Sequence, residues 1–375
     1  MRKHWIDNLR WVTVLLVLLY HVFYFYNNKG VFGGIGGFGP WPEFPQYQDV
    51  VMYILYPWFM PLLFLLAGIS ARYALEKRTP KEWFRARTRK LLLPVTLGLF
   101  VFQWIVGYFN TAGVAEIRQV PQPVRYLIWA GSGTGPLWFI QDLLAFSALL
   151  LLVRKADAKN HFFEACGRAF GGRMGLLWIL LIGALFWVGE LTLIRHPRPQ
   201  SADGLLNLYK PLFYLIPFLM GWFIFAHEEV QEKLRKAWIP LLASAVAVGG
   251  VLIATTFGQD NTSPQYLQSP LNCLYGWLAC IALMGWFAAR FDRTSAFAGW
   301  MTRSSYGLYI VHYAVIASFG YMMKTYTQLP PWSMYVILTV AVFTLSPLLY
   351  ELLHRIPFVR WCIFGEKKRG AAPAK

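Results

Sequence analysis

The stretch "NLRWVTVLLVLLYHVFYFY", residues 8–26, is apolar along almost its whole length, yet it contains Arg10 near its start and His21 near its end. About 20 apolar residues are enough to cross the roughly 30 Å hydrocarbon core of a bilayer as a helix. The stretch is therefore expected to span a membrane. Ionisable groups inside a span are costly and usually face the protein interior or a cavity, so the two residues require an explanation.

The composition of the whole chain is that of an integral membrane protein. Of its 375 residues, 57% are hydrophobic and only 14% are charged, whereas a soluble domain has about 25% charged residues. The chain has 35 Lys and Arg against 18 Asp and Glu, a net charge of +17. In a membrane protein such an excess is typical of cytoplasmic loops next to anionic lipid, so the bilayer is the expected partner and nucleic acid is not.

Apolar runs of sufficient length recur along the chain and predict an all-α polytopic membrane protein with about ten transmembrane helices. They cover residues 9–26, 50–72, 91–109, 135–153, 174–194, 211–227, 238–257, 271–289, 305–323 and 332–351. We expect a single transmembrane domain over residues 1–355 and a basic cytoplasmic tail over residues 356–375. The four cysteines fit no disulfide framework and are expected to be reduced thiols.

The basic residues predict the orientation of the chain. Ten spans place both termini on one side, and the segments assigned to that side contain 28 of the 35 Lys and Arg residues. The opposite side has the other seven: Lys29, Arg118, Arg125, Arg195, Arg198, Lys210 and Lys324. Because positive charge accumulates in cytoplasmic loops, both termini are expected to be cytoplasmic.

Arg10 and His21 are eleven residues apart, which is close to three full turns of a helix. Both side chains therefore lie on one face, separated by about 16 Å along the axis. Taken singly, Arg10 can be interpreted as a residue whose side chain extends to the membrane surface. His21 can be interpreted as a hydrogen-bonded residue of the core. Together, a cation and a base on one stripe suggest a ligand along the helix, with its anionic part at Arg10 and its reactive end at His21.

At this point the sequence resembles a known family. A basic residue, ten residues and a His in the first membrane helix are the hallmark of the acyltransferase 3 family of membrane-bound acyltransferases. The similarity extends over essentially the whole chain, in the order and spacing of four segments. These are "DNLRWVTVLLVLLYH" (7–21), "RARTRKLLLP" (85–94), "GPLWFIQDLL" (135–144) and "SSYGLYIVHY" (304–313). The third segment is also similar to the branch that includes periplasmic glucan succinyltransferases, with O-acetyltransferases as the other option.

The resemblance implies an enzyme that transfers an acyl group from cytoplasmic acyl-CoA to a hydroxyl, usually on an extracytoplasmic glycan. Acetyl and succinyl are the expected acyl groups, and the acceptor is expected to be a glycan or glycolipid. Acyl-CoA would be a co-substrate, with no tightly bound cofactor. The expected location is the bacterial inner membrane, as a multi-pass protein. A homodimer is also possible on the sequence alone.

The segment "KRTPKEWFRARTRK", residues 77–90, contains seven Lys and Arg residues. One interpretation is an ordinary cytoplasmic loop and helix end. The other is a cradle for the phosphates of coenzyme A, because arginine forks match phosphate oxygens. The expected phosphate ligands are Arg10, Arg85, Arg87, Arg89 and Lys90. The family often has two arginines three residues apart here, and this chain has Arg87 and Lys90 at that spacing.

Polar side chains in other predicted spans complete the candidate site. Asp142 is a carboxylate inside a span, where it needs a cation or a hydrogen-bond donor, and we expect it to orient His21. The expected contacts to the acceptor substrate are Trp138, Glu190, Ser305, Tyr309 and His312. Each has a simpler interpretation: an interfacial aromatic for Trp138, a pair with Arg195 for Glu190, and hydrogen bonds between helices for the last three.

These residues predict one chemical scheme. His21 would act as general base on the acceptor hydroxyl, with Asp142 fixing the imidazole tautomer. No metal-ligand spacing such as HExxH or CxxC occurs, so no metal is expected. A transporter or exporter of a glycan or lipid is the alternative, because ten spans and buried charges allow it. The sequence contains no inverted repeat that would favour transport.

Overall fold

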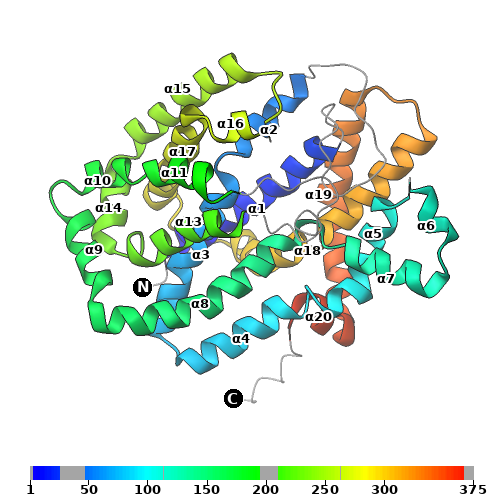
Figure 1. Ribbon diagram of the computed structural model, residues 1–375, viewed down its shortest axis with the longest axis horizontal. Helices are drawn as coiled ribbons and strands as arrows, with labels where there is room; N and C mark the ends of the chain where they lie inside the picture. Colours follow the sequence, from blue (N-terminus) through cyan, green and yellow to red (C-terminus); the bar gives the residue numbers. More distant parts are fainter. Residues whose placement is uncertain (1–2, 26–46, 113, 195–209, 262, 367–375) are drawn as a thin grey trace. The chain divides into compact units, whose positions relative to one another are not determined.

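The computed structural model describes residues 3–25, 47–112, 114–194, 210–261 and 263–366, and in these ranges all regular structure is helical (Figure 1). The predicted all-α fold is therefore confirmed. Among the described residues, seven helical segments are long and apolar enough to cross a membrane: His4–Tyr24, Val50–Glu76, Gly135–Asn160, Gly175–Thr192, Trp238–Thr256, Pro270–Arg290 and Trp332–Arg355. Pro211–Phe223 and Glu228–Lys236, which meet at 101°, make an eighth if they form one broken span.

Two of the ten predicted spans, 91–109 and 305–323, do not correspond to any of these helical segments. The run 91–109 is interrupted: α4 (Pro80–Leu92) ends, and the π-helix η2 (Leu99–Gln103) leads into the short α5 (Trp104–Asn110). Pro94 accounts for the interruption because it has no N–H to continue the helical hydrogen bonds. The run 305–323 lies inside α18 (Ala296–Tyr326), one helix of 31 residues. The total of ten spans and the membrane side of the termini remain predictions.

The chain forms two units, the first from residues 1–20, 44–83 and 146–303 and the second from residues 21–43, 84–145 and 304–375. The first contains η1 (Tyr47–Asp49), α2 (Val50–Leu55), α3 (Phe59–Glu76), α9 (Phe162–Gly171), α10 (Gly175–Leu181), α11 (Ala184–Thr192), α13 (Pro211–Phe223), α14 (Glu228–Lys236), α15 (Trp238–Thr256), α16 (Pro264–Leu267) and α17 (Pro270–Arg290). Helices α3 and α13 approach closely at Gly68 and Gly221. A Cβ on Gly68 would lie 2.1 Å from the carbonyl oxygen of Phe218, so only glycine permits this contact.

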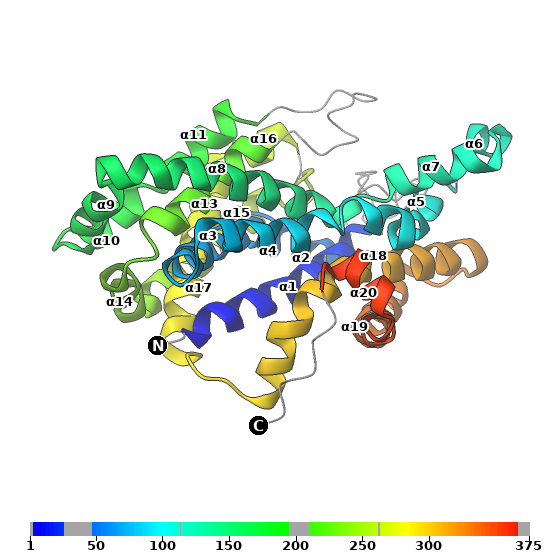
Figure 2. The same cartoon turned by 90° about the horizontal axis from the view of Figure 1, so that it is seen from below.

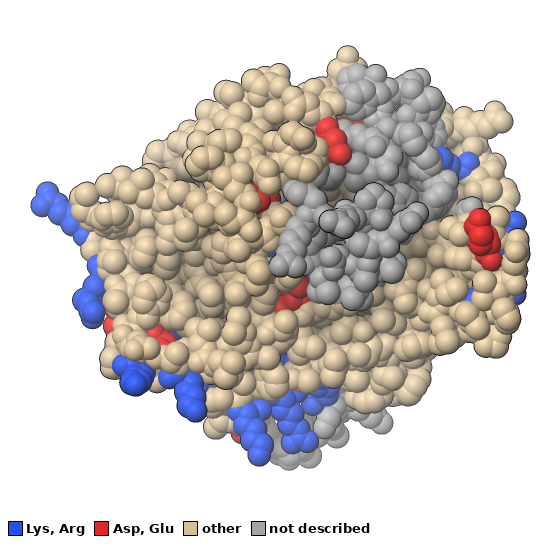
Figure 3. All heavy atoms as spheres, viewed as in Figure 1, with Lys and Arg blue, Asp and Glu red and all other residues tan. Residues whose placement is uncertain are grey.

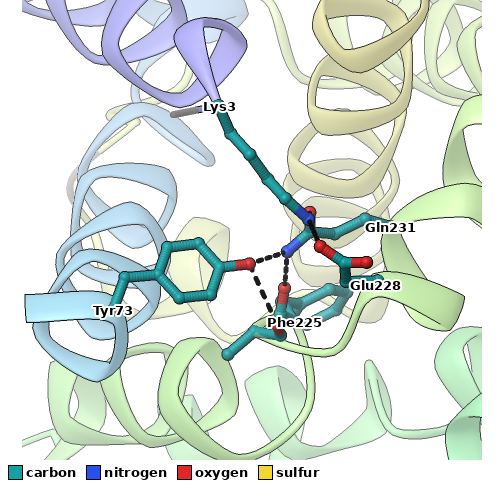
Figure 4. A network of polar contacts seen from close by, with 6 residues as sticks. Lys3, Tyr73, Phe225, Glu228 and Gln231 are labelled. Atoms are coloured by element: carbon teal, nitrogen blue, oxygen red, sulfur yellow. Dashed lines mark hydrogen bonds and ion pairs between the residues drawn. The ribbon is translucent and has the colours of Figure 1, made fainter. Parts of the chain in front are cut away.

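A polar network ties the start of the chain to α3 and α14 within the first unit (Figure 4). The ammonium of Lys3 donates to Oε1 of Gln231 at 2.7 Å and pairs with Glu228 at 3.0 Å. The amide nitrogen of Gln231 in turn donates to the hydroxyl of Tyr73 at 2.8 Å and to the carbonyl oxygen of Phe225 at 2.6 Å. These bonds hold three segments, far apart in sequence, at one end of the unit.

Two further contacts add to the same group of segments. The backbone N–H of Trp5 donates to the carboxylate of Asp292 at 3.0 Å. Arg72 pairs with Asp157 at 3.9 Å. With the Lys3 network, these bonds join parts of residues 1–10, 72–90, 154–173, 227–236 and 290–303. These are segments that the charge pattern assigns to a single face of the membrane.

The second unit contains α5, α6 (Ala115–Gln119), α7 (Gln122–Ser132), η3 (Gly135–Leu137), the start of α8 (Trp138–Asn160), most of α18, α19 (Pro331–Arg355) and α20 (Pro357–Phe364). Helices α5 and α7 lie side by side (Figure 1 and Figure 2). A Cβ on Gly107 of α5 would lie only 1.7 Å from the carbonyl oxygen of Trp129. Helix α20 forms part of the predicted tail, and its Cys362 is buried; all four cysteines are buried and free, as expected.

Candidate active site

His21 meets two aromatic side chains of α18 inside the second unit. The rings of His312 and Tyr313 lie 5.1 and 5.2 Å from the ring of His21, measured between centroids. His21 belongs to the last turns of α1 (His4–Phe25). The fold thus brings together two histidines that are 291 residues apart in sequence.

Hydrogen bonds connect the two imidazoles to the backbone of α18. Nδ1 of His312 lies 2.7 Å from the carbonyl oxygen of Tyr309, three residues earlier in the helix. Nε2 of His312 lies 3.3 Å from Nδ1 of His21. His312 is completely buried. A carbonyl oxygen can only accept a hydrogen bond, so Nδ1 of His312 must carry the proton.

The segment "GPLWFIQDLL" forms a break between two helices beside these histidines. After α7, the chain turns through η3 and continues as α8. Gly135 has a φ of +39°, which a glycine tolerates because it has no Cβ. The hydroxyl of Tyr309 donates to the carbonyl oxygen of Pro136 in this break, and its ring lies 5.8 Å from that of Phe139. Tyr309 therefore contributes both its side chain and its backbone to the site.

Gln103, the last residue of η2, also bonds the backbone of α18. Its amide nitrogen donates to the carbonyl oxygen of Ile310 at 2.9 Å, and the side chain is buried. A Cβ on Gly133 would lie 2.1 Å from the carbonyl oxygen of Gln103. The backbone that follows α7 therefore packs against the backbone of Gln103. Sequence reasoning missed Gln103, although a lone amide inside the apolar run 91–109 is a signal of the kind that marked Asp142.

Asp142 lies on α8, five residues after the last residue of η3. It is 6% exposed, and its Oδ2 has no hydrogen-bond partner among the described residues. The carboxyl group is near enough to the Tyr309 hydroxyl to interact with it electrostatically. No hydrogen bond joins Asp142 to His21 in the described part of the chain, and Nδ1 of His21 is hydrogen-bonded to His312 instead.

The basic residues predicted to bind phosphate lie on α4, which is helical throughout Arg85–Lys90 as expected. Figure 3 shows Lys and Arg side chains gathered along this helix, next to wide areas without charge. Arg85 and Lys90 are exposed, and Arg87 and Arg89 are half-buried. The helix begins with a capping box, in which Thr79 and Glu82 bond each other's backbone N–H at 3.2 and 3.3 Å. The bonds from Thr79 lower the pKa of the Glu82 carboxyl.

Two of these basic residues also anchor α4 within the second unit. Nε of Arg89 donates to the carbonyl oxygen of Gly365 at 3.2 Å. The ammonium of Lys90 lies 4.7 Å from the ring centroid of Tyr306, whose hydroxyl donates to the carbonyl oxygen of Lys90 at 2.6 Å. Arg85 is exposed on the same helix, and Arg87 is near enough to the hydroxyl of Tyr306 to interact with it electrostatically.

Arg10 is partly exposed and belongs to the first unit. Its guanidinium pairs with Asp7 at 3.2 Å and donates to the hydroxyl of Ser70 at 2.9 Å. Arg10 and His21 lie on one continuous helix, α1, as the apolar run predicts. The Asp7 and Ser70 contacts hold the Arg10 side chain at a defined point on that helix.

Glu190 belongs to the first unit as well. It lies on α11, is 6% exposed, and is near enough to Lys210 to interact with it electrostatically. Lys210 is also buried, with its ammonium 3.4 Å from the hydroxyl of Tyr56. Arg195, the partner predicted for Glu190, lies outside the described residues.

Two predicted acceptor contacts remain. Ser305 is buried on α18, one turn before Tyr309. Trp138 is the first residue of α8 and is partly exposed. The described residues contain no group of three or more His, Cys, Asp or Glu side chains able to hold a metal ion.

The second unit therefore contains an imidazole, that of His21, whose Nδ1 is in a hydrogen bond. This arrangement suits proton transfer at the other ring nitrogen, Nε2.

The sequence matches the model of the Acyl_transf_3 family, described as an acyltransferase domain, over residues 3–351. No curated protein and no solved structure matches the chain. Because the family match covers nearly the whole sequence and the described helices include at least seven that could cross a membrane, the chain belongs to the Acyl_transf_3 family and is a multi-pass membrane acyltransferase.

Proposed function

We propose that the protein is a membrane-embedded O-acyltransferase of the bacterial inner membrane. It would move an acetyl or succinyl group from cytoplasmic acyl-CoA to a hydroxyl of an extracytoplasmic glycan or glycolipid. The observation that carries the proposal is the placement of His21 on an apolar helix, with Nδ1 in a hydrogen bond to a buried imidazole. Such an imidazole suits a general base for an alcohol that attacks a thioester.

The reaction divides into two proton transfers at His21. The acceptor hydroxyl gives its proton to Nε2 of His21 as its oxygen forms a bond to the thioester carbonyl carbon. The carbon–sulfur bond then breaks, and the coenzyme A thiolate takes the proton from Nε2. The products are the ester and the free thiol, and His21 returns to its neutral state. The chain has no GxSxG motif that would suggest a serine acyl-enzyme.

The donor would bind through the basic residues. Arg10, Arg85, Arg87, Arg89 and Lys90 are the proposed phosphate ligands. Of those on α4, Arg85 is exposed, whereas Arg89 and Lys90 also anchor the helix. Helix α1 is continuous from His4 to Phe25, so Arg10 and His21 are about 16 Å apart along its axis. A pantetheine arm can span that distance from bound phosphates to a thioester at His21.

The acceptor would approach the reacting centre from the outer side of the membrane. Trp138, which is partly exposed at the break between α7 and α8, and Tyr309, which bonds Pro136 in this break, are the proposed acceptor contacts there. Ser305 and Glu190 are further candidates for acceptor contacts. Asp142 would act through Tyr309, with which it interacts.

Purified protein in lipid nanodiscs tests the proposal directly. Acetyl-CoA and succinyl-CoA are supplied with an extracted envelope-glycan fraction, and the release of coenzyme A thiol is followed with a thiol reagent. We expect thiol release that depends on the acceptor, together with a mass increase of the glycan that matches the acyl group. A transporter would consume no thioester, so the absence of thiol release with both donors and with glycolipid acceptors would refute the proposed function.

A further inference from the structure

We infer that His312 is a positioning residue that fixes the tautomer of His21 and stabilises its protonated form. The inference rests on the proposed function, because it assigns a role in the same proton transfer. It also changes the place of His312 in the reaction: the sequence suggested a substrate contact, whereas the structure connects the side chain to His21 and to the backbone.

The first step concerns the proton on His312. Its Nδ1 lies 2.7 Å from the carbonyl oxygen of Tyr309. If Nδ1 carried a lone pair, two acceptors would face each other at this distance, so Nδ1 must be the N–H that donates. In the neutral ring, Nε2 is then an acceptor.

The second step follows along the chain of bonds. Nε2 of His312, as an acceptor, faces Nδ1 of His21 at 3.3 Å. Nδ1 of His21 must therefore be the donor, and a neutral His21 then has its lone pair on Nε2. The carbonyl oxygen of Tyr309 thus sets the tautomers of both rings, in the way that the hydrogen bond of one ring nitrogen sets the role of the other.

The third step concerns the charge that forms on His21. When Nε2 of His21 takes the hydroxyl proton, the ring becomes an imidazolium with a stronger Nδ1–H donor. Nε2 of His312 already accepts from that N–H, so the bond becomes charge-assisted without any rearrangement. His312 neither gains nor loses a proton in the cycle, and the only bonds that form or break are those of the acyl transfer.

The surroundings keep His312 in this arrangement. Its side chain is completely buried, which disfavours a charged ring that would donate from both nitrogens. Two contacts hold the helix that carries it near this carbonyl: the Tyr309 hydroxyl donates to the carbonyl oxygen of Pro136, and the Gln103 amide donates to the carbonyl oxygen of Ile310. The position of the anchoring carbonyl is therefore defined by tertiary contacts as well as by the helix.

Two substitutions of His312 by amide side chains distinguish a role in positioning His21 from a role in packing alone. In His312→Gln, the longer side chain can place its amide oxygen near the position of Nε2 and accept from His21. In His312→Asn, the amide can still reach the Tyr309 carbonyl but is too short to reach His21. The measurements are kcat and KM for acyl-CoA and for the acceptor, with acyl-CoA binding and the unfolding temperature as checks of folding.

We expect His312→Asn to lower kcat by at least about 100-fold, the lower end of the effect of general base catalysis, with both KM values within about 3-fold of wild type. His312→Gln should keep at least about ten times the kcat of His312→Asn. Equal kcat values for the two variants, or a loss confined to the KM of the acceptor, would overturn the positioning role. Failure of the proposed function looks different, because the wild-type protein would then release no thiol from acyl-CoA.

Discussion

Gly135 lies directly against the ring of Tyr313: a Cβ on this glycine would approach Cδ1 of the ring to 3.0 Å. The backbone of Gly135 also has a φ of +39°. The ring of Tyr313 is in turn 5.2 Å from that of His21. The break between α7 and α8 is therefore packed, through one tyrosine ring, against the histidine that we propose as the base.

Gly135→Ala should destabilise the protein by about 1–3 kcal/mol, because a non-glycine residue is strained at this φ and the methyl group would press on Tyr313. Activity should fall with it, since the displaced ring contacts His21. Thermal unfolding in detergent, together with kcat, measures both effects. Gly131→Ala is the matched control, because nothing lies within 4 Å of its Cβ and Ala favours the helix of α7. A Gly135→Ala protein as stable and active as Gly131→Ala would contradict the packing described here.

His21→Ala should abolish acyl transfer while the protein still inserts into the membrane and binds acyl-CoA. A general base contributes about 10²–10⁴-fold to a rate, so turnover should fall by at least 100-fold. His161→Ala is the control, since His161 is an exposed residue of the first unit. Turnover of His21→Ala close to that of His161→Ala would exclude His21 as the base.

Replacing Arg85 or Arg87 by Ala should weaken acyl-CoA binding by about 1.5–3 kcal/mol, the range of a hydrogen bond to a charged group. This equals roughly a 10- to 150-fold increase in Kd, with little change in kcat. Calorimetric titration of the purified variants with acyl-CoA measures it. Lys81→Ala is the control on the same helix, because Lys81 is exposed and lies outside Arg85–Lys90.

Arg89→Ala should differ from Arg85→Ala, because Arg89 also donates a hydrogen bond to the carbonyl oxygen of Gly365. We expect a lower unfolding temperature in addition to any effect on binding. If neither Arg85, Arg87 nor Arg89 affects acyl-CoA affinity, the phosphate cradle on α4 is disproved.

The two substrates should enter from opposite sides of the membrane. In proteoliposomes of uniform orientation, acyl-CoA added on the face that bears the termini should react with acceptor enclosed on the other face. The charge distribution is the reason, since 28 of the 35 Lys and Arg residues lie on the side predicted to be cytoplasmic. Transfer only when both substrates share one compartment would rule out a path through the membrane, even for an active enzyme.

Much of the local structure could be predicted from the sequence. The run that contains Arg10 and His21 is one helix, α1, and Arg85–Lys90 lie on another, α4. Such predictions succeed because helical hydrogen bonds are local and the apolar length needed to span a bilayer is set by its thickness. The prediction is weakest where a single residue interrupts a run, as at Pro94, because hydropathy averages over the break.

The sequence by itself determined the fold class and the family, and it marked His21 and His312 as candidate site residues. Only the tertiary structure decided that these two side chains lie next to each other. The physical reason is that hydropathy specifies which segments are buried but not which helix faces meet. Contacts between residues 291 positions apart depend on the packing of whole helices. Here that packing includes close approaches at glycines and a hydrogen bond from the buried amide of Gln103 to the backbone of α18.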